Sequence, residues 1–584
     1  METHGGHIIA DVLQSHGVRH LFTLCGGHIS PILVGAKARG IRVIDMRGEA
    51  GAVFAADALA RLTGRPGVAA VTAGPGVTNA LTALKNAQMA QSPLVLLGGA
   101  AATIIKGRGS LQDIDQIGLV KSIVKVALTI NRNCDIVPVL AHAFRVARSD
   151  VPGPVFVECP IDLLYAETEV RRWYGGARDG AAETKGLKSK LFQFYLQRHL
   201  DRMFVCDFDD MPPLLEPVEA PELPAAKVDK AARLLGAARR PVLIVGSQAL
   251  LQPESTRRLA DAVTRIGAPV YLTGMARGLL GVDHPLQMRH HRKKALAAAD
   301  LVLLAGMPCD FRLNYGRAIP SAATLIAANR DKAALTLNRR PTLALHADPG
   351  DFLCVLSEER PLEDIAAPWS EWTATLRRAD QEREDEIAAL ADRPAAQGVN
   401  PIAFFNRLEN FLDERATLVA DGGDFVATAA YVLRPRGPLR WLDPGPFGTL
   451  GVGAGFAAGA QLVRPGEEVW LLYGDGAAGY SLQEMDTFVR HGLPIIAVVG
   501  NDAAWAQIAR DQVKLLEDDV ATTLRRSDYH IVARGFGAKG LLVRTREEID
   551  PALAQAREFA RKGMPVLINV WLGPTDFREG SISM

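Results

Sequence analysis

Two apolar stretches indicate the fold most clearly: Val469-Trp-Leu-Leu-Tyr-Gly-Asp475-Gly476 and, further along the chain, Pro494-Ile-Ile-Ala-Val-Val-Gly-Asn501-Asp502. In each stretch an apolar run leads directly into an oxygen-bearing side chain. Short apolar runs of this kind are typical of strands that are buried on both faces of a parallel sheet. The residues between the two runs are enough for one crossover helix. We therefore predict two neighbouring parallel strands, each followed by a carboxylate.

This pair of carboxylates predicts a metal and diphosphate site. Ligands gather at the carboxyl ends of parallel strands, so Asp475 and Asp502 are expected side by side. Carboxylate and carbonyl oxygens bind Mg²⁺ when a phosphate-bearing ligand and water complete the shell. The alternative left open is that Gly474-Asp475-Gly476 is a simple turn and Asn501-Asp502 a helix cap.

The same alternation of apolar runs and helical patterns extends over nearly the whole chain, which indicates α/β domains with parallel sheets. At 584 residues the chain is too long for one hydrophobic core, and its 48% apolar residues suffice for several. We expect an N-terminal domain, a linker with one helix, a central α/β domain, a connector, a C-terminal domain and a tail that is either a lid or a frayed end. The bounds expected for these six parts are 1–170, 171–225, 226–358, 359–396, 397–575 and 576–584.

Charge and cysteine content narrow the partners and the compartment. The formal net charge of +1 gives no basic excess, so nucleic acid is not expected as a partner. The sequence contains neither a membrane-spanning apolar run nor an apolar leader, so we expect no membrane partner and a cytoplasmic location. The six cysteines form no Cys-x-x-Cys pair, and we interpret them as reduced thiols.

Further candidate residues lie in two other parts of the chain. Ile41-Arg-Val-Ile-Asp45-Met-Arg-Gly-Glu49 reads as a strand that delivers Glu49 to the start of a helix over 50–62. Glu49 is then either a carboxylic acid that serves catalysis or a residue that complements the helix dipole. Asp421-Gly-Gly-Asp-Phe425 follows a strand and can present backbone amides to phosphate oxygens. Gly451-Val-Gly-Ala-Gly455 does not have the spacing of a dinucleotide fingerprint.

A family resemblance rests on motifs from all parts of the chain. Gly474-Asp475-Gly476 followed by Asn501-Asp502 resembles the motif of the thiamine-diphosphate-dependent enzyme superfamily. The chain also resembles, in several sequence motifs, the acetolactate-synthase-like branch to which 2-hydroxyacyl-CoA lyase activity is assigned. The stretches that carry this similarity are Thr72-Ala-Gly-Pro75-Gly, Gly274-Met-Ala-Arg-Gly-Leu-Leu-Gly, Trp441-Leu-Asp-Pro-Gly and Asp576-Phe-Arg-Glu-Gly-Ser-Ile.

The resemblance implies a role for each candidate residue. Glu49 would be the activating carboxylate, and His28 and Gln112 would face the reactive carbon. Asp475, Asp502 and the Ala504 carbonyl would hold Mg²⁺. The residues implied to bind the cofactor are Pro75, Asn79, Gly422, Asp424, Phe425, Gly448, Leu450, Gly474, Gly476 and Ala477. Taken alone, Leu450 reads as a core leucine, His28 as a structural histidine and Gln112 as a loop residue. The chain departs from the family at two positions, with Gly48 where many relatives have His and Asp502 where the motif has a second Asn.

The resemblance also implies an activity and an assembly. The expected fold is three doubly wound domains. The first would bind the pyrimidine end of the cofactor and the third its diphosphate end, while the ligand of the central domain is left open. The expected cofactors are thiamine diphosphate and Mg²⁺, and whether the central domain holds FAD, ADP or CoA is left open. The implied enzyme is a carbon–carbon lyase that converts a 2-hydroxyacyl-CoA into an aldehyde and formyl-CoA, or runs the reverse acyloin-type condensation. The alternatives are an acetolactate-synthase-like or benzaldehyde-lyase-like carboligase acting on small ketones or aldehydes, and a non-catalytic homologue. A homodimer or homotetramer with intersubunit active sites is expected.

Overall fold

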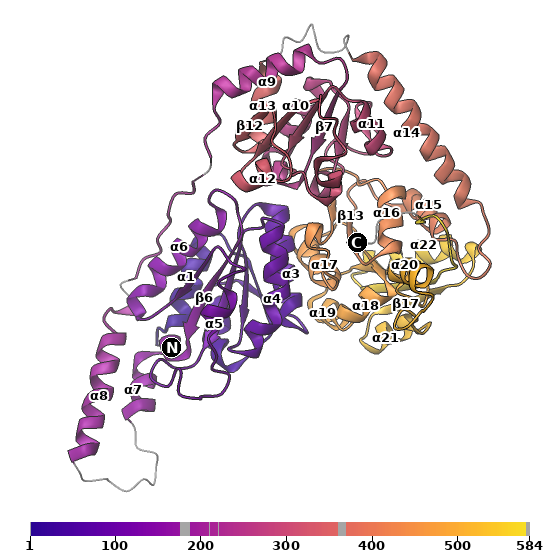
Figure 1. The fold of residues 1–584 in the computed structure, drawn as a ribbon. Helices are drawn as coiled ribbons and strands as arrows, with labels where there is room; N and C mark the ends of the chain where they lie inside the picture. The colour runs from indigo at the N-terminus through magenta and orange to yellow at the C-terminus, as the bar shows by residue number, and fades with distance from the viewer. Residues whose placement is uncertain (1, 176–186, 209–210, 220, 360–368, 580–584) are drawn as a thin grey trace. The chain divides into compact units, whose positions relative to one another are not determined.

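The computed structural model describes residues 2–175, 187–208, 211–219, 221–359 and 369–579. Three six-stranded sheets organise these residues, and every strand pairing is parallel (Figure 1). By contacts the chain divides into two compact units: one is 1–60 with 65–219, the other 61–64 with 220–584. The first unit contains the first sheet, and the second unit contains the other two. The expected α/β fold with three parallel sheets is confirmed.

The first sheet has the strand order β2-β1-β3-β4-β6-β5. Its strands are β1 (His20–Thr23), β2 (Arg42–Asp45), β3 (Gly67–Val71), β4 (Leu94–Ala100), β5 (Val126–Thr129) and β6 (Pro154–Pro160). Its helices are α1 (Gly5–Ser15), α2 (Ser30–Ala38), α3 (Glu49–Thr63), α4 (Pro75–Met89), α5 (Gln116–Val120) and α6 (Ile136–Arg148). Helices α1 and α6 pack on one face and share one apolar core with the sheet, while α3 and α4 lie on the other face (Figure 1). Because both faces are covered, β3, β4 and β6 are buried along their full length.

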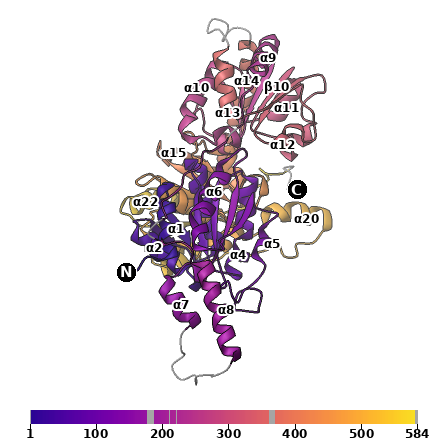
Figure 2. The same ribbon diagram turned by 90° about the vertical axis from the view of Figure 1, so that its left-hand side faces the viewer.

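Two helices follow the first sheet in the same unit, α7 (Glu167–Gly175) and α8 (Leu187–Met203). Only the second was expected from the sequence. Both project away from the first sheet, as Figures 1 and 2 show from two directions. The side-chain carboxylate of Asp162 links α7 to the body of the unit, since it accepts hydrogen bonds from Tyr174 Oη (2.9 Å) and Thr103 N (2.8 Å).

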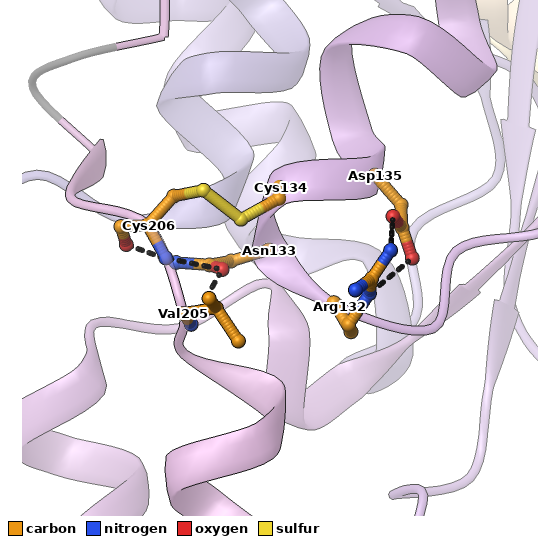
Figure 3. The surroundings of a disulfide bond; sticks show 6 residues. All are labelled: Arg132, Asn133, Cys134, Asp135, Val205 and Cys206. Carbon is orange, nitrogen blue, oxygen red and sulfur yellow. Dashed lines mark hydrogen bonds and ion pairs between the residues drawn. A yellow bond between two sulfur atoms is a disulfide. The ribbon is translucent and has the colours of Figure 1, made fainter.

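A disulfide between Cys134 and Cys206 fixes the chain directly after α8, with the two Cα atoms 5.5 Å apart (Figure 3). Beside it, Asn133 Oδ1 accepts hydrogen bonds from the backbone N–H groups of Val205 (3.2 Å) and Cys206 (3.3 Å). The expectation of six reduced cysteines is therefore wrong for this pair. The two residues are 72 positions apart, and only the return of the chain along α8 brings them together, which no local spacing could indicate.

The central sheet has the order β12-β11-β10-β7-β8-β9. Counted from its own first strand, this is the 3-2-1-4-5-6 order of doubly wound folds read from the other edge. Its strands are β7 (Pro241–Val245), β8 (Val270–Leu272), β9 (Gln287–Met288), β10 (Leu301–Ala305), β11 (Thr324–Asn329) and β12 (Leu343–His346). Its helices are α9 (Ala225–Ala237), α10 (Thr256–Ile266), α11 (Arg292–Ala298), α12 (Lys332–Thr336) and α13 (Pro349–Glu358). The long helix α14 (Ser370–Ala391) follows it.

The third sheet has the order β14-β13-β15-β16-β18-β17, which is the order of the first sheet when its strands are counted from one. Its strands are β13 (Thr417–Asp421), β14 (Trp441–Leu442), β15 (Val469–Gly474), β16 (Ile496–Asn501), β17 (Lys539–Val543) and β18 (Val566–Trp571). Its helices are α15 (Pro401–Phe411), α16 (Asp424–Val432), α17 (Gly453–Val463), α18 (Asp475–Ser481), α19 (Glu484–His491), α20 (Ala506–Leu516), α21 (Tyr529–Gly535) and α22 (Ile549–Arg561). Two short helices, α18 and α19, therefore replace the single crossover helix expected between β15 and β16.

The beginning of the C-terminal tail packs inside the second unit. The Phe577 ring meets the Tyr431 ring edge to face at 5.8 Å between centroids, and the Arg578 guanidinium lies 5.0 Å over the same ring. Residues 580–584 lie outside the described part of the chain, so the expected lid stays a prediction. Among the described residues, no helix is both long and apolar enough to cross a bilayer.

Candidate active site

The two predicted metal ligands lie at the ends of neighbouring strands. Strand β15 pairs with β16 through Gly474 and Gly500, and Asp475 and Asp502 follow these strands directly. Asp475 accepts hydrogen bonds from Gly476 N and Ala503 N, both at 2.8 Å. Asp502 accepts one from Ala504 N at 3.2 Å. The prediction of two adjacent carboxylates at one sheet edge therefore matches the geometry.

Electrostatics indicate that this edge suits a cation. Burial raises the pKa of Asp475, and burial together with the charge of Asp475 raises the pKa of Asp502. Two buried carboxylates that oppose each other's ionisation would be stabilised by a divalent ion between them. Within the described residues, no group of three or more His, Cys, Asp or Glu side chains could hold a metal. The remaining ligands would therefore be backbone carbonyls, water or phosphate oxygens.

Backbone segments approach each other closely beside these carboxylates. Gly422 has a φ of +141°, and a Cβ at this position would lie 2.9 Å from Gly474 N and 3.5 Å from the Ala477 Cβ. Only glycine permits both the backbone conformation and the approach. Glycine at position 422 therefore allows the segment that follows β13 and the end of β15 to pack backbone against backbone.

Other predicted cofactor residues take different positions. Asp424, at the start of α16, forms an ion pair with Arg510 of α20. The Phe425 side chain lies in the core, with its ring 4.5 Å from that of Phe405 between centroids, so only its backbone could reach a ligand. Asn501, in the same motif as Asp502, is fully buried and donates to Ser527 O (3.0 Å) and Asn569 Oδ1 (3.2 Å). The Asn501 side chain therefore connects the end of β16 to Ser527 and to Asn569 of β18.

The loop that carries Gly448 and Leu450 is held by a residue that the sequence did not single out. Asp421, at the end of β13, is fully buried and accepts hydrogen bonds from Gly451 N (3.1 Å) and Gly453 N (2.8 Å). Burial raises its pKa to about 7, although both N–H groups oppose that shift. Leu450 is partly exposed, which disfavours its reading as an ordinary core leucine. The signal that could have revealed Asp421 is an acidic residue closing an apolar strand.

In the first unit, Glu49 and Asn79 come together at the starts of two helices. Glu49 begins α3, directly after the turn that follows β2, and its residue is 8% exposed. Asn79, on the first turns of α4, donates a hydrogen bond from Nδ2 to Glu49 Oε2 at 3.1 Å. Pro75 is the first residue of α4, in the same helix as Asn79, and it is exposed. A Cβ at Gly48 would meet no atom within 4 Å, so this position opens onto free space.

His28 and Gln112 form a second pair in this unit. The His28 Nδ1 atom lies 3.3 Å from Thr72 Oγ1, and the Gln112 side chain is hydrogen-bonded to His28. Burial lowers the pKa of His28 more than this hydrogen bond raises it, so the imidazole is neutral at pH 7. Gln112 has a φ of +64°, a strained conformation for this residue type that is typical of functional sites.

A buried polar network that the sequence did not indicate supports the Gln112 loop. Gln116 accepts a hydrogen bond from Gly74 N (2.9 Å) and donates to Glu158 Oε1 (3.1 Å). Glu158 is fully buried within β6 and forms an ion pair with Lys106, which lies in the loop that leads to Gln112. A carboxylate in an otherwise apolar strand was the available signal.

The fold and these two groups of residues define a cofactor-dependent enzyme built from doubly wound domains, and comparisons with known proteins give its family. Residues 3–119 match the N-terminal binding domain of thiamine pyrophosphate enzymes, residues 228–356 their central domain and residues 421–570 their C-terminal binding domain. The chain belongs to the thiamine pyrophosphate enzyme family.

Relatives extend the similarity over the full chain. The chain is 49% identical to 2-hydroxyacyl-CoA lyase 2 of Bos taurus over 587 residues, covering 100% of this chain and 92% of that protein. The corresponding protein of Homo sapiens is 48% identical with the same coverage. Acetolactate synthase large subunit IlvG of Mycobacterium tuberculosis is 35% identical over 573 residues, covering 98% of this chain and 96% of that protein.

Proposed function

We propose that the protein is a thiamine-diphosphate- and Mg²⁺-dependent lyase that cleaves a 2-hydroxyacyl-CoA into an aldehyde and formyl-CoA. The observation that carries the proposal is the full-length identity of 49% to a relative named 2-hydroxyacyl-CoA lyase 2. The paired carboxylates at the β15 and β16 ends and the Glu49–Asn79 pair supply the groups that the cofactor requires. The domain bounds expected from the sequence stay part of this proposal.

The diphosphate end of the cofactor would be held by the second unit. Asp475, Asp502 and the Ala504 carbonyl would bind Mg²⁺, while backbone N–H groups of the glycine segments at Gly422 and Gly474 would receive phosphate oxygens. Leu450 and Gly448, on the loop fixed by Asp421, would contact the rings. When bound, thiamine diphosphate supplies the electron sink that allows a bond next to a carbonyl to break.

The first unit would supply the residues that move protons. Glu49 would hold a proton on its carboxyl group for the pyrimidine ring, with Asn79 fixing the carboxyl orientation through the 3.1 Å hydrogen bond. Neutral His28 would accept the proton of the substrate hydroxyl, and Gln112 would orient the imidazole. The bond between the hydroxyl-bearing carbon and the thioester carbonyl breaks, and the hydroxyl proton is balanced by the proton that the formyl carbon gains.

Assembly and compartment form a second part of the proposal. We expect a homodimer or homotetramer with active sites shared between subunits, because the pyrimidine and diphosphate residues belong to separate units of the chain. The cytoplasmic location expected from the sequence is opposed by the Cys134–Cys206 disulfide, since such bonds persist in oxidising compartments. Alkylation of free thiols in freshly lysed cells distinguishes a cytoplasmic protein from one in an oxidising compartment. In a cytoplasmic protein Cys134 and Cys206 would both be labelled, whereas the disulfide would protect both from labelling.

The activity is tested by product analysis. Purified protein with Mg²⁺ and thiamine diphosphate is incubated with a 2-hydroxyacyl-CoA or with pyruvate, and aldehyde, formyl-CoA and acetolactate are quantified. We expect aldehyde and formyl-CoA in equal amounts from the first substrate. Faster formation of acetolactate from pyruvate would instead assign the acetolactate-synthase activity of the 35% identical relative. No turnover of either substrate, or of an aromatic aldehyde, would leave a non-catalytic homologue.

A further inference from the structure

Helix α8 has an apolar and aromatic face that is exposed near its beginning. Leu191, Phe194 and Tyr195 are 60%, 64% and 51% exposed. Positions three, four and seven residues apart share one face of a helix, so Arg198 and Arg202 continue the same face. Both arginines are exposed, and neither has an ion-pair partner among the residues that the structure describes. We call these five residues the α8 face.

The opposite side of α8 is firmly packed, so the exposure of the α8 face does not reflect a loose helix. Leu196, Leu200 and Met203 are 6%, 2% and 3% exposed and point into the first unit. The His199 Nε2 atom lies 2.8 Å from Thr103 Oγ1, and the Cys206 disulfide follows the end of the helix. The second half of α8 is thereby fixed, while the first half projects beyond the rest of its unit (Figures 1 and 2).

Further exposed aromatic and cationic side chains lie next to the α8 face. Phe192, on the flank of the α8 face, is 58% exposed, and Trp173 at the end of α7 is 46% exposed. Lys190 is exposed, and the Arg172 side chain is 77% exposed. A projecting patch of apolar and aromatic side chains next to several cations is the composition of an interfacial membrane-binding helix.

We propose that the α8 face docks onto an anionic phospholipid membrane. Leu191, Phe194 and Tyr195 enter the boundary between headgroups and acyl chains, and Arg198 and Arg202 contact headgroup phosphates. A rise of about 1.5 Å per residue places the two arginines roughly 5 and 11 Å along the helix from the aromatic pair. An interfacial helix lies in the plane of the membrane surface, so this spacing puts the guanidinium groups beside the inserted side chains, where the long arginine stems let them reach headgroup phosphates.

A second copy of the chain fits this face less well. A two-fold interface made by this face would gather four arginines, two from each copy, and the five residues of the face include no carboxylate to pair with them. The three apolar side chains are also far fewer than the roughly 20 residues per side of a stable interface. The sequence does not predict this membrane partner, because a helix that binds a membrane surface needs no apolar run long enough to span it.

Vesicle flotation of the full-length, cofactor-loaded protein tests the proposal. The vesicles contain phosphatidylcholine alone or mixed with phosphatidylserine, at low and at high salt. We expect the protein to float with the mixed vesicles at low salt and to remain below at high salt, because contacts between arginine and phosphate are screened. Wild-type protein that never floats with the mixed vesicles would overturn the proposal.

Matched variants assign the binding to the α8 face. The double variant Phe194→Ser/Tyr195→Ser should lower the bound fraction about tenfold, whereas Phe311→Ser/Tyr315→Ser, at 51% and 53% exposed positions of the central domain, should not. Variants that bind like wild type would overturn the proposal. So would a lower molar mass of Phe194→Ser/Tyr195→Ser in light scattering with unchanged flotation, because the face would then join copies of the chain.

Charge-reversal variants distinguish the contribution of Arg198 and Arg202 to vesicle binding from the effect of the protein's net charge. Arg198→Glu/Arg202→Glu should abolish the preference for phosphatidylserine. Lys230→Glu/Arg257→Glu changes the net charge equally at two exposed positions of the central domain and should keep that preference. Equal behaviour of the two double variants would contradict the proposed headgroup contacts. Circular dichroism and lyase turnover of all variants should match wild type, which shows that the fold is intact.

Discussion

Replacing Asp421 by Asn tests how the loop of Gly448 and Leu450 is held. The carboxylate is fully buried at the end of β13 and accepts the N–H groups of Gly451 and Gly453. Asn has the same shape and never carries a charge. Both N–H groups contact the same oxygen, Oδ2, at 3.1 and 2.8 Å, so an amide oxygen in that place keeps both acceptors. The NH₂ group meets only the second contact of Gly451 N, which lies 3.2 Å from Oδ1.

The magnitude of the pH effect follows from the raised pKa. Burial raises the pKa of Asp421 to about 7 in the folded protein, against about 3.9 in an unfolded chain. Well below pH 4 the carboxyl is protonated in both states, and it costs no stability. As the pH rises to 7 the unfolded state loses its proton first, so folding loses about 1.4 kcal/mol per pH unit. Between pH 5 and pH 7 wild type should therefore lose about 2 kcal/mol relative to Asp421→Asn.

The assay is urea unfolding of cofactor-free wild type and variant at a series of pH values, followed by tryptophan fluorescence. The difference in free energy of unfolding between the two proteins is plotted against pH, which cancels the titration of all other groups. We expect the variant to gain on wild type steadily up to pH 7 and to hold a constant difference above it. A difference independent of pH would refute the claim that Asp421 is buried with a raised pKa. The KM for thiamine diphosphate should rise in the variant, since an NH₂ group replaces the Oδ1 atom that also contacts Gly451 N.

Three further substitutions test other parts of the account. Asn133→Ala removes the acceptor of two backbone N–H groups beside the disulfide and should lower the stability of the first unit by about 2 kcal/mol, measured by limited proteolysis; unchanged cleavage would contradict the role of Asn133. Gly476→Ala places a Cβ against the Trp505 ring and should raise the KM for the cofactor about tenfold through a cost of about 1–3 kcal/mol, whereas an unaffected KM would show that Trp505 yields freely. Asn79→Ala should lower kcat about tenfold with little change in cofactor affinity, and a loss confined to affinity would argue against its positioning of Glu49.

The sheets and the strand ends could be predicted because both follow from local patterns. Continuous apolar runs mark strands buried on both faces, and Asp475 and Asp502 follow such runs directly. Strand β5 (Val126–Thr129) is harder to recognise in the sequence, because it is an edge strand that is only partly buried. Helix α7 was missed because its sequence is strongly polar and has no wide apolar stripe.

The interactions that support the site could not be predicted, because they join residues far apart in sequence. Gln116 and Glu158 meet across 42 positions, and Asp421 meets Gly451 across 30. Nothing local distinguishes a supporting carboxylate such as Asp421 from a proposed metal ligand such as Asp475, since both follow an apolar run. The disulfide has the same origin, because Cys134 and Cys206 approach only after α8 has returned to the first sheet.

The central claim is that Glu49 activates a thiamine diphosphate anchored through Asp475 and Asp502. Its most direct test is the exchange rate of the thiazolium C2 proton of the bound cofactor, read by NMR after acid quench in deuterium oxide. We expect rapid exchange in wild type and a rate about 10²–10⁴ times lower in Glu49→Gln with cofactor still bound. Equal exchange rates in the two proteins would contradict it.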